Sequence, residues 1–201
     1  MKKLFILIIF IIFGVAGFSQ EFNAGVYGGL AASQLDGDTY AGYYKPGLIT
    51  GGYVYRYFNK KWAWQFGLRY AQKGSKFTSS RLGIYYKSQL HYFEMPLTLR
   101  YFYWKKVDME FGVSLGYLIS AFEDKGGYGL APADPPFNKF ELAGIFGISY
   151  HFTESLAVGV HFSYSITAVR PYSSGYESFM DNGQHNNVLY FALYYNISSW
   201  R

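Results

Sequence analysis

The sequence has 201 residues, of which 22% are aromatic, with a formal net charge of +5 and no cysteine. This length suits one domain with a full core, and the lack of cysteine excludes disulfides, thiolate metal sites and thiol nucleophiles. No block of five or more like charges is present, so a nucleic-acid-binding arm is not expected.

The N-terminus has the pattern of an export signal. Two lysines follow Met1, and an apolar run over residues 4–18 comes directly after them. We therefore expect a signal peptide over residues 1–20 and a mature domain over residues 21–201. An uncleaved helical anchor is the alternative, but a spanning helix needs about 20 apolar residues and this run is shorter.

From residue 21 onward the chain has the pattern of successive β-strands. Apolar and polar residues alternate with period two in eight segments, and one face of every segment is nearly all apolar and carries no charge. The predicted strands cover about residues 22–33, 47–58, 62–73, 89–102, 108–121, 139–152, 156–169 and 187–198.

The fourth segment shows the alternation most clearly, in the stretch YFEMPLTLRY at residues 92–101. One face is apolar and consists of Phe93, Met95, Leu97, Leu99 and Tyr101. The other face is mostly polar and consists of Tyr92, Glu94, Pro96, Thr98 and Arg100. A proline inside a strand removes a ladder hydrogen bond. We therefore expect a bulge or a local break at Pro96 that helps to aim Glu94 inward.

The apolar faces carry the larger side chains, and these are too many to fit inside eight strands. A soluble barrel turns its large apolar side chains inward, whereas a transmembrane barrel is apolar outside and polar inside. The sequence therefore predicts an all-β, eight-stranded antiparallel transmembrane up-and-down β-barrel. In the second segment, this rule places Ile49, Tyr53, Tyr55 and Tyr57 on the lipid side and Arg56 on the lumenal side.

The connections between the predicted strands alternate in length. Four are long, at 34–46, 74–88, 122–138 and 170–186, and three are short, at 59–61, 103–107 and 153–155. Outer-membrane barrels have short periplasmic turns and longer external loops. Because the first connection is long, we expect the mature chain to start in the periplasm.

Polar side chains on the predicted lumenal faces indicate a structural ion-pair network. Its expected members are Arg56, Arg69, Glu94, Arg100, Glu110 and His161. Charges taken out of water need partners, so we expect Glu94 to bridge to Arg69 or Arg100, and Arg100 to face Glu110 across neighbouring strands. The alternative is that Glu94 meets trapped water.

Tyrosines in the long connections are candidate contact residues, because tyrosine supplies rigid, amphipathic contact area at low entropic cost. They either bind a partner or anchor the rim of the barrel in the membrane. These loop tyrosines are Tyr40, Tyr43, Tyr44, Tyr128, Tyr172 and Tyr176.

Three stretches resemble the PorT-like outer-membrane β-barrel family: GLRYAQKGSK at 67–76, YFEMPLTLRY at 92–101 and FELAGIFGISY at 140–150. The Glu-x-Pro-Leu core at 94–97 is the most specific piece, and the resemblance covers most of residues 21–201. The resemblance implies an eight-stranded, porin-like barrel in the cell outer membrane. Some members of that family are similar to accessory proteins of a secretion system.

No motif for catalysis is present: the sequence has no HExxH, no GxSxG and no P-loop. Asp36-Gly37-Asp38 fits an ordinary turn better than a calcium loop, and His151 and His161 fit hydrogen-bonded lumenal histidines better than a catalytic base. We therefore expect no metal or cofactor and no enzymatic activity.

The favoured function is a structural or accessory barrel surrounded by outer-membrane lipid, with another envelope or secretion protein as the candidate partner. A narrow pore for small solutes is the second reading, because eight strands leave an interior just wide enough for side chains to fill. A membrane-embedded enzyme acting on lipid comes third, and a soluble ligand-binding barrel fourth.

Overall fold

The structure is a computed structural model, and it describes residues 22–38, 40, 42–79, 81, 83–104, 106–171 and 183–197. The predicted signal peptide over residues 1–20 lies outside the described residues and stays a prediction. No helix in the described part of the chain is long and apolar enough to cross a membrane.

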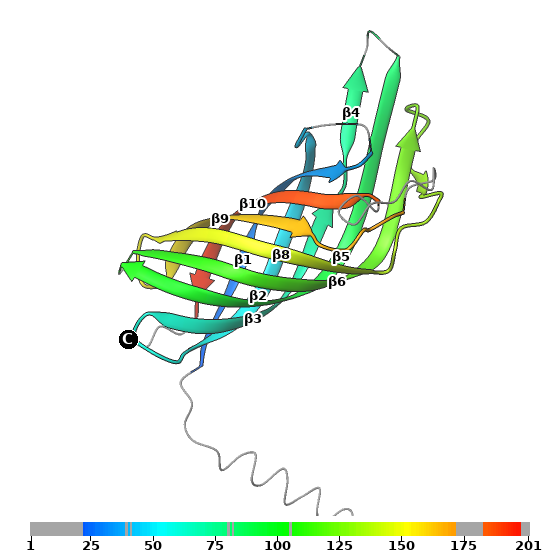
Figure 1. The fold of residues 1–201 in the computed structure, drawn as a ribbon. Helices are drawn as coiled ribbons and strands as arrows, with labels where there is room; N and C mark the ends of the chain where they lie inside the picture. The colour runs from blue at the N-terminus through cyan, green and yellow to red at the C-terminus, as the bar shows by residue number, and fades with distance from the viewer. Residues whose placement is uncertain are drawn as a thin grey trace, which may run out of the picture.

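Eight antiparallel strands form a closed ring (Figure 1). They are β1 (Asn23–Asp36), β2 (Lys45–Tyr57), β3 (Trp62–Lys73), β5 (Ile84–Trp104), β6 (Val107–Lys125), β8 (Phe140–His151), β9 (Leu156–Ser165) and β10 (His185–Asn196). Each strand pairs with the next one along the chain, and β1 pairs with β10 to close the ring. The predicted eight-stranded antiparallel barrel is therefore confirmed.

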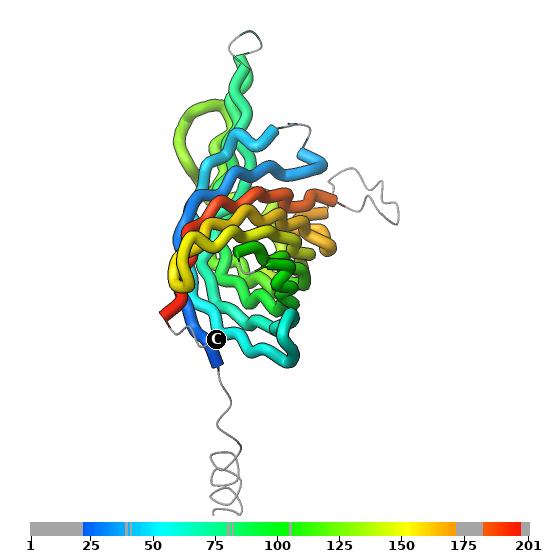
Figure 2. The backbone as a smooth tube through the Cα atoms, turned by 90° about the vertical axis from the view of Figure 1, so that its left-hand side faces the viewer, coloured from blue at the N-terminus to red at the C-terminus, as the bar shows by residue number. Residues whose placement is uncertain are grey.

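Two short strands, β4 (Lys76–Ser79) and β7 (Ala131–Pro132), lie outside the ring and were not predicted. β4 pairs with the first residues of β5, and β7 pairs with the last part of β6. β5 and β6 are themselves longer than expected, and the β4–β5 hairpin projects beyond the rest of the barrel (Figures 1 and 2). We call this end of the barrel the loop end and the opposite end the turn end. The described residues of the loop-end connections are 37–38, 40, 42–44, 74–79, 81, 83, 126–139, 166–171 and 183–184.

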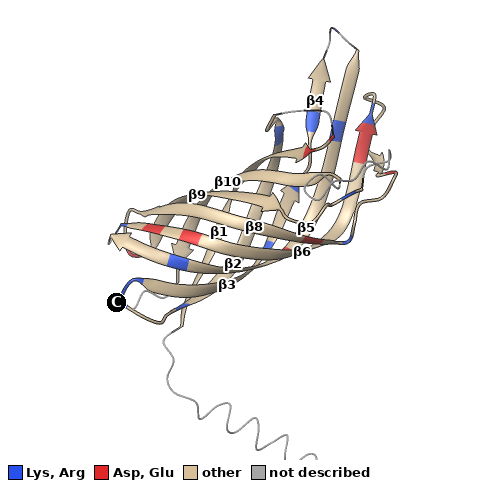
Figure 3. Ribbon diagram, in the orientation of Figure 1, with Lys and Arg blue, Asp and Glu red and all other residues tan. Residues whose placement is uncertain are grey.

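The two faces of the strands separate as the alternation predicts. On β5, Phe93 and Leu97 are 47% and 53% exposed, whereas Glu94 and Thr98 are 1% and 3% exposed. The same contrast holds along β3, β6, β8, β9 and β10. Charged residues of both signs occur along the strands of the ring (Figure 3). The exterior of the ring is therefore apolar and its interior polar.

The predicted faces of β2 are wrong. Ile49, Tyr53 and Tyr55 are buried inside the barrel, and Tyr57 packs against the same cluster. Val54 and the half-buried Arg56 lie on the outer face. The Tyr53 hydroxyl donates a hydrogen bond of 2.6 Å to Asn196 Oδ1, and the Arg100 guanidinium lies 5.0 Å from the centre of the Tyr55 ring. Tyrosine has an apolar body and a polar tip, so alternation alone does not decide which way it points.

Pro96 sits at a local break in one ladder, without a bulge. The β3–β5 ladder pairs Phe66 with Leu97 and then resumes at Arg69 with Glu94, in the same register. A β-carbon on Gly67 would lie 3.0 Å from the ring of Pro96, so the glycine leaves room for the proline where its missing N–H interrupts the ladder. Glu94 points inward because the register is unchanged.

Closure of the barrel gives the first prediction, which concerns the β1–β10 seam. Gly29 faces Ala192 in register, and a β-carbon on Gly29 would lie 2.1 Å from the Phe191 carbonyl oxygen. Gly29→Ala should therefore strain the seam by about 1–3 kcal/mol and lower the temperature at which the fast-migrating form in SDS converts to the boiled form.

Gly28→Ala is the matched control, because the nearest atom to its added β-carbon is 3.9 Å away. This neighbouring substitution should leave the conversion temperature close to that of the unsubstituted protein. Equal shifts for both variants would contradict the strained seam, and identical migration of unheated and boiled protein would contradict closure.

Candidate functional site

The centre of the lumen is filled by a chain of ion pairs around Glu94. Arg69 Nε donates to Glu94 Oε2 at 2.5 Å, and Lys73 Nζ lies 2.5 Å from Glu94 Oε1. Lys73 also lies 3.0 Å from Glu141 Oε2, so one lysine on β3 joins a carboxylate on β5 to another on β8. Arg69 and Lys73 lie 5.0 Å and 4.9 Å from the centres of the Tyr190 and Tyr92 rings. These charges therefore have partners of opposite sign and aromatic neighbours.

A second cluster lies nearer the turn end. Arg100 makes two hydrogen bonds to Asp108, from Nε to Oδ1 at 3.0 Å and from NH2 to Oδ2 at 2.7 Å. His151 Nε2 lies 2.5 Å from Asp108 Oδ2. Glu110 is opposite Arg100 in the ladder, but its carboxylate accepts from Thr98 Oγ1 at 2.9 Å and lies 3.4 Å from His161 Nε2.

Five of the six residues expected in the network lie inside the barrel, and Arg56 lies outside. Of the two partners expected for Glu94, the structure brings Arg69 to it and places Arg100 on Asp108 instead. Lys73 and Asp108 were missed, although both share a face with predicted members: Lys73 with Arg69, and Asp108 with Glu110. The period-two alternation places both residues on the lumenal face. They were missed because they lie at the ends of the predicted segments.

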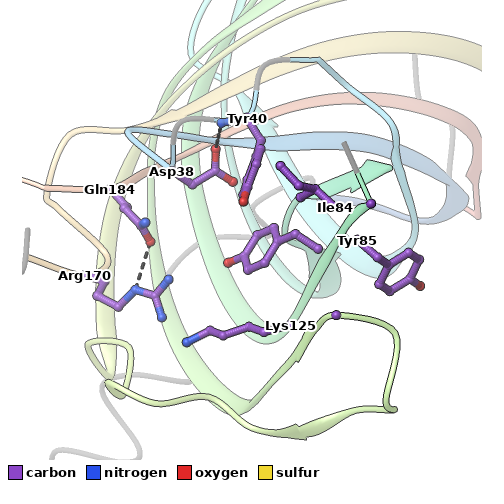
Figure 4. Close-up of a pocket in the computed structure, with 10 residues that line it drawn as sticks. Asp38, Tyr40, Ile84, Tyr85, Lys125, Arg170 and Gln184 are labelled. Atoms are coloured by element: carbon purple, nitrogen blue, oxygen red, sulfur yellow. Dashed lines mark hydrogen bonds between the residues drawn. The ribbon is translucent and has the colours of Figure 1, made fainter. Parts of the chain in front are cut away.

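Above this filled centre, the loop end contains a cavity of about 420 Å³. Four connections or strand ends line it: the β1–β2 connection, the β4–β5 hairpin, the end of β6 and the β9–β10 connection (Figure 4). Its lining residues include Asp38, Tyr40, Tyr85, Lys125, Arg170 and Gln184. Small-molecule sites are commonly cavities of this size with a few convergent polar groups.

Tyr40 holds one wall of this cavity in place. Its ring stacks on Phe77 and on Tyr86, with centroids 4.7 Å and 5.1 Å apart. The Tyr40 backbone N–H donates to Asp38 Oδ1 at 2.8 Å, and the buried Ser75 hydroxyl lies beside the same carboxylate. Burial raises the pKa of the Asp38 carboxyl above its ordinary value.

The opposite wall is built around Arg170. Its NH2 lies 2.8 Å from Glu123 Oε1, and its Nε donates to Gln184 Oε1 at 2.9 Å. Glu123 also accepts from the Tyr86 hydroxyl at 2.7 Å and lies 3.1 Å from Lys125 Nζ. The two cations of this wall are therefore already paired with one carboxylate.

The loop tyrosines divide into two kinds. Tyr40 lies in the cavity wall, and Tyr43 donates to Asn187 Oδ1 at 2.5 Å. Tyr44 and Tyr128 are 68% and 96% exposed at the loop end. The two remaining candidates, Tyr172 and Tyr176, lie outside the described residues. Within the described ranges, no group of three or more His, Asp or Glu side chains could hold a metal ion.

A closed antiparallel ring with an apolar exterior and a polar, filled interior defines an integral barrel of the outer membrane. The sequence matches a family model described as an outer membrane protein beta-barrel domain over residues 18–169, more than half of the chain. The protein belongs to this family and is located in the outer membrane.

Solved structures show the same fold. The attachment invasion locus protein Ail of Yersinia pestis is 16% identical, with a TM-score of 0.53 over 88% of this chain and 99% of Ail. The Neisserial surface protein A, NspA, is 11% identical, with a TM-score of 0.56 over 86% of this chain and 96% of NspA. A search of curated proteins found no match.

The second prediction is a double-mutant cycle in the lumen. Removing one partner from a buried ion pair costs about 3–5 kcal/mol, so Glu94→Gln and Lys73→Gln should each lower the free energy of unfolding by about this amount. Because the two groups lie 2.5 Å apart, the double variant should be much less destabilised than the sum, as measured by urea unfolding of the barrel in lipid vesicles.

Two controls sharpen this cycle. Glu94→Gln should show no coupling to Arg100→Gln, whose partner is Asp108. Arg56→Gln on the outer face should change the free energy of unfolding by less than about 1 kcal/mol. Additive effects at Glu94 and Lys73 would rule out the ion-pair core.

Proposed function

We propose that the protein is a non-enzymatic accessory barrel that binds a partner through its loop end and conducts no solute. One observation carries this proposal: the lumen is filled by buried ion pairs around Glu94, while the loop end carries a cavity and the exposed Tyr44 and Tyr128. In this proposal, the lumenal ion pairs block the interior of the barrel, and the partner binds to the loop end.

The loop end is the side that would face the cell exterior, because outer-membrane barrels place their longer connections outside. A structure of Ail in complex with the heparin analogue sucrose octasulfate supports ligand binding by a barrel of this fold.

Within the outer-membrane β-barrel family, we also propose that the protein is PorT-like. This assignment is supported by the stretches at 67–76, 92–101 and 140–150, among which Glu94 and Pro96 form the most specific piece. In this reading the partner is another envelope protein, such as a component of a secretion system, and the exposed tyrosines supply contact area.

The third prediction separates an accessory barrel from a pore. In planar lipid bilayers, the purified protein should show no steady conductance of porin size, because the groups that fill the lumen stabilise one another. A porin reconstituted in the same way serves as the positive control. Stable openings in the unsubstituted protein would refute the proposal and establish the narrow pore.

The fourth prediction locates the partner surface. A photo-cross-linking amino acid at Tyr128, which is 96% exposed, should form a defined cross-linked product in intact cells. The same probe at Lys60, exposed in the β2–β3 turn at the opposite end, is the control and should not form this product. Identical products from both positions, or none from Tyr128, would contradict a partner at the loop end.

A further inference from the structure

The charged side chains of the β4–β5 hairpin are all cationic. Residues 74–93 contain Lys76, Arg81 and Lys87 and no Asp or Glu, and Figure 3 shows basic residues on β4 and on the part of β5 beside it. Lys76 and Lys87 are directly opposite each other in the antiparallel ladder, and like charges in this position repel each other. The hairpin itself therefore supplies no counter-ion for this pair of lysines.

A third lysine adds to this positive charge. Lys45, the first residue of β2, is buried, and its Nζ donates to the Pro46 carbonyl oxygen at 2.7 Å. Lys76 and Lys87 are the two cations whose charges act on it through space. In the part of the chain that the structure describes, no ion pair includes any of these three lysines. A cluster of one sign of charge attracts ligands of the opposite sign.

The carboxylate opposite Lys87 on the other side of β5 does not neutralise the cluster. Asp124 on β6 pairs with Lys87 in the ladder, but its Oδ1 accepts a hydrogen bond of 2.8 Å from the Gly127 backbone N–H. Asp124 is buried, whereas Lys76 and Lys87 are only half-buried. An anion can therefore reach these two ammonium groups from outside, while Lys45 adds its charge from within the protein.

The two lysines lie on the side of the sheet that continues the lipid face of the barrel. Along β5 this face passes from the exposed Leu97 and Phe93 to the half-buried His91 and Lys87. Lys76 shares the face, because it is directly opposite Lys87. The change from apolar to polar side chains between Phe93 and His91 marks the edge of the hydrocarbon region, so the lysines stand above it on the side of the surrounding lipid.

The height of the lysines above the hydrocarbon distinguishes between two kinds of lipid. Lys87 comes six positions beyond Phe93 on β5, which corresponds to about 15 Å above Phe93 at the usual rise per residue and strand tilt. The headgroup layer of a phospholipid is only about 5–8 Å thick, so its phosphate lies well below Lys87. Phosphates carried on the sugar headgroup of a glycolipid lie further from the hydrocarbon, at the height of these lysines.

We propose that Lys76 and Lys87 bind a phosphate on the headgroup of an outer-leaflet glycolipid, and that the charge of Lys45 strengthens this site. The ammonium groups donate charge-assisted hydrogen bonds to the phosphate oxygens, and the anion offsets the repulsion between the paired lysines. This lipid site is separate from the partner surface proposed at Tyr128 and does not depend on it.

The test measures lipid binding to the whole mature barrel in zwitterionic detergent by native mass spectrometry, which counts the lipids retained on each protein molecule. The probe is an acylated glucosamine disaccharide with two phosphates, and the reference is the same lipid without phosphates. The phosphorylated lipid should bind saturably and about tenfold or more tightly than the reference. Lys76→Gln combined with Lys87→Gln should abolish this preference.

Two matched controls accompany this variant. Lys60→Gln combined with Lys61→Gln removes the same charge from exposed positions in the β2–β3 turn and should leave the preference unchanged. Lys76→Arg combined with Lys87→Arg keeps both charges and should retain the preference. All of these variants should keep the heat-shifted band in SDS gels, which shows that the barrel is folded.

Equal binding of the two lipids, or an unchanged preference in the glutamine variant of Lys76 and Lys87, would overturn the site. Two further probes test the source of the phosphate. Phosphatidylglycerol that binds as tightly as the disaccharide lipid would reveal a general contact with anionic lipids. Displacement of the disaccharide lipid by an equimolar amount of inorganic phosphate would reveal a site for a free anion. Either result would overturn the assignment to a glycolipid.

Discussion

The structure depends on one constraint: inside a lipid bilayer, every backbone N–H and C=O group must find its partner within the protein. The pairing of β1 with β10 meets this constraint, because it leaves no open edge in the ring of eight strands. Closure then divides every strand into a lipid face and a lumenal face. An eight-stranded ring encloses space for side chains only, so the polar residues that alternate with the apolar ones are forced together.

The charged residues of the lumen therefore must satisfy one another. Lys73 lies between the carboxylates of Glu94 and Glu141, and Asp108 lies between Arg100 and His151. Glu141 also accepts hydrogen bonds from Ser165 and Asn186, at 2.6 Å and 3.2 Å. The filling of the centre leaves the loop end as the part of the molecule where a cavity and exposed side chains are available.

The sequence predicted the barrel because period-two alternation follows directly from strand geometry, and a charge-free face is what lipid requires. It failed at β2, where Tyr53 and Tyr55 were placed in lipid, because tyrosine is suited to either side and only its partners decide. Lys73 and Asp108 could have been found by extending the alternation to the ends of the segments. The cavity could not be predicted, since it arises where the connections carrying Asp38 and Arg170 meet the start of β5, which carries Tyr85.

The hydrogen bonds of Glu141 have a consequence for assembly. Its partners lie on β3, β9 and β10, so a residue on β8 joins an early strand to the last two strands of the ring. A slip of one residue in any strand exchanges its lipid and lumenal faces, and a slip of β8 would turn Glu141 toward lipid and leave Lys73 with one carboxylate fewer. The buried partners of Glu141 thus favour the observed register of β8, since a slipped strand would exchange these partners for hydrocarbon.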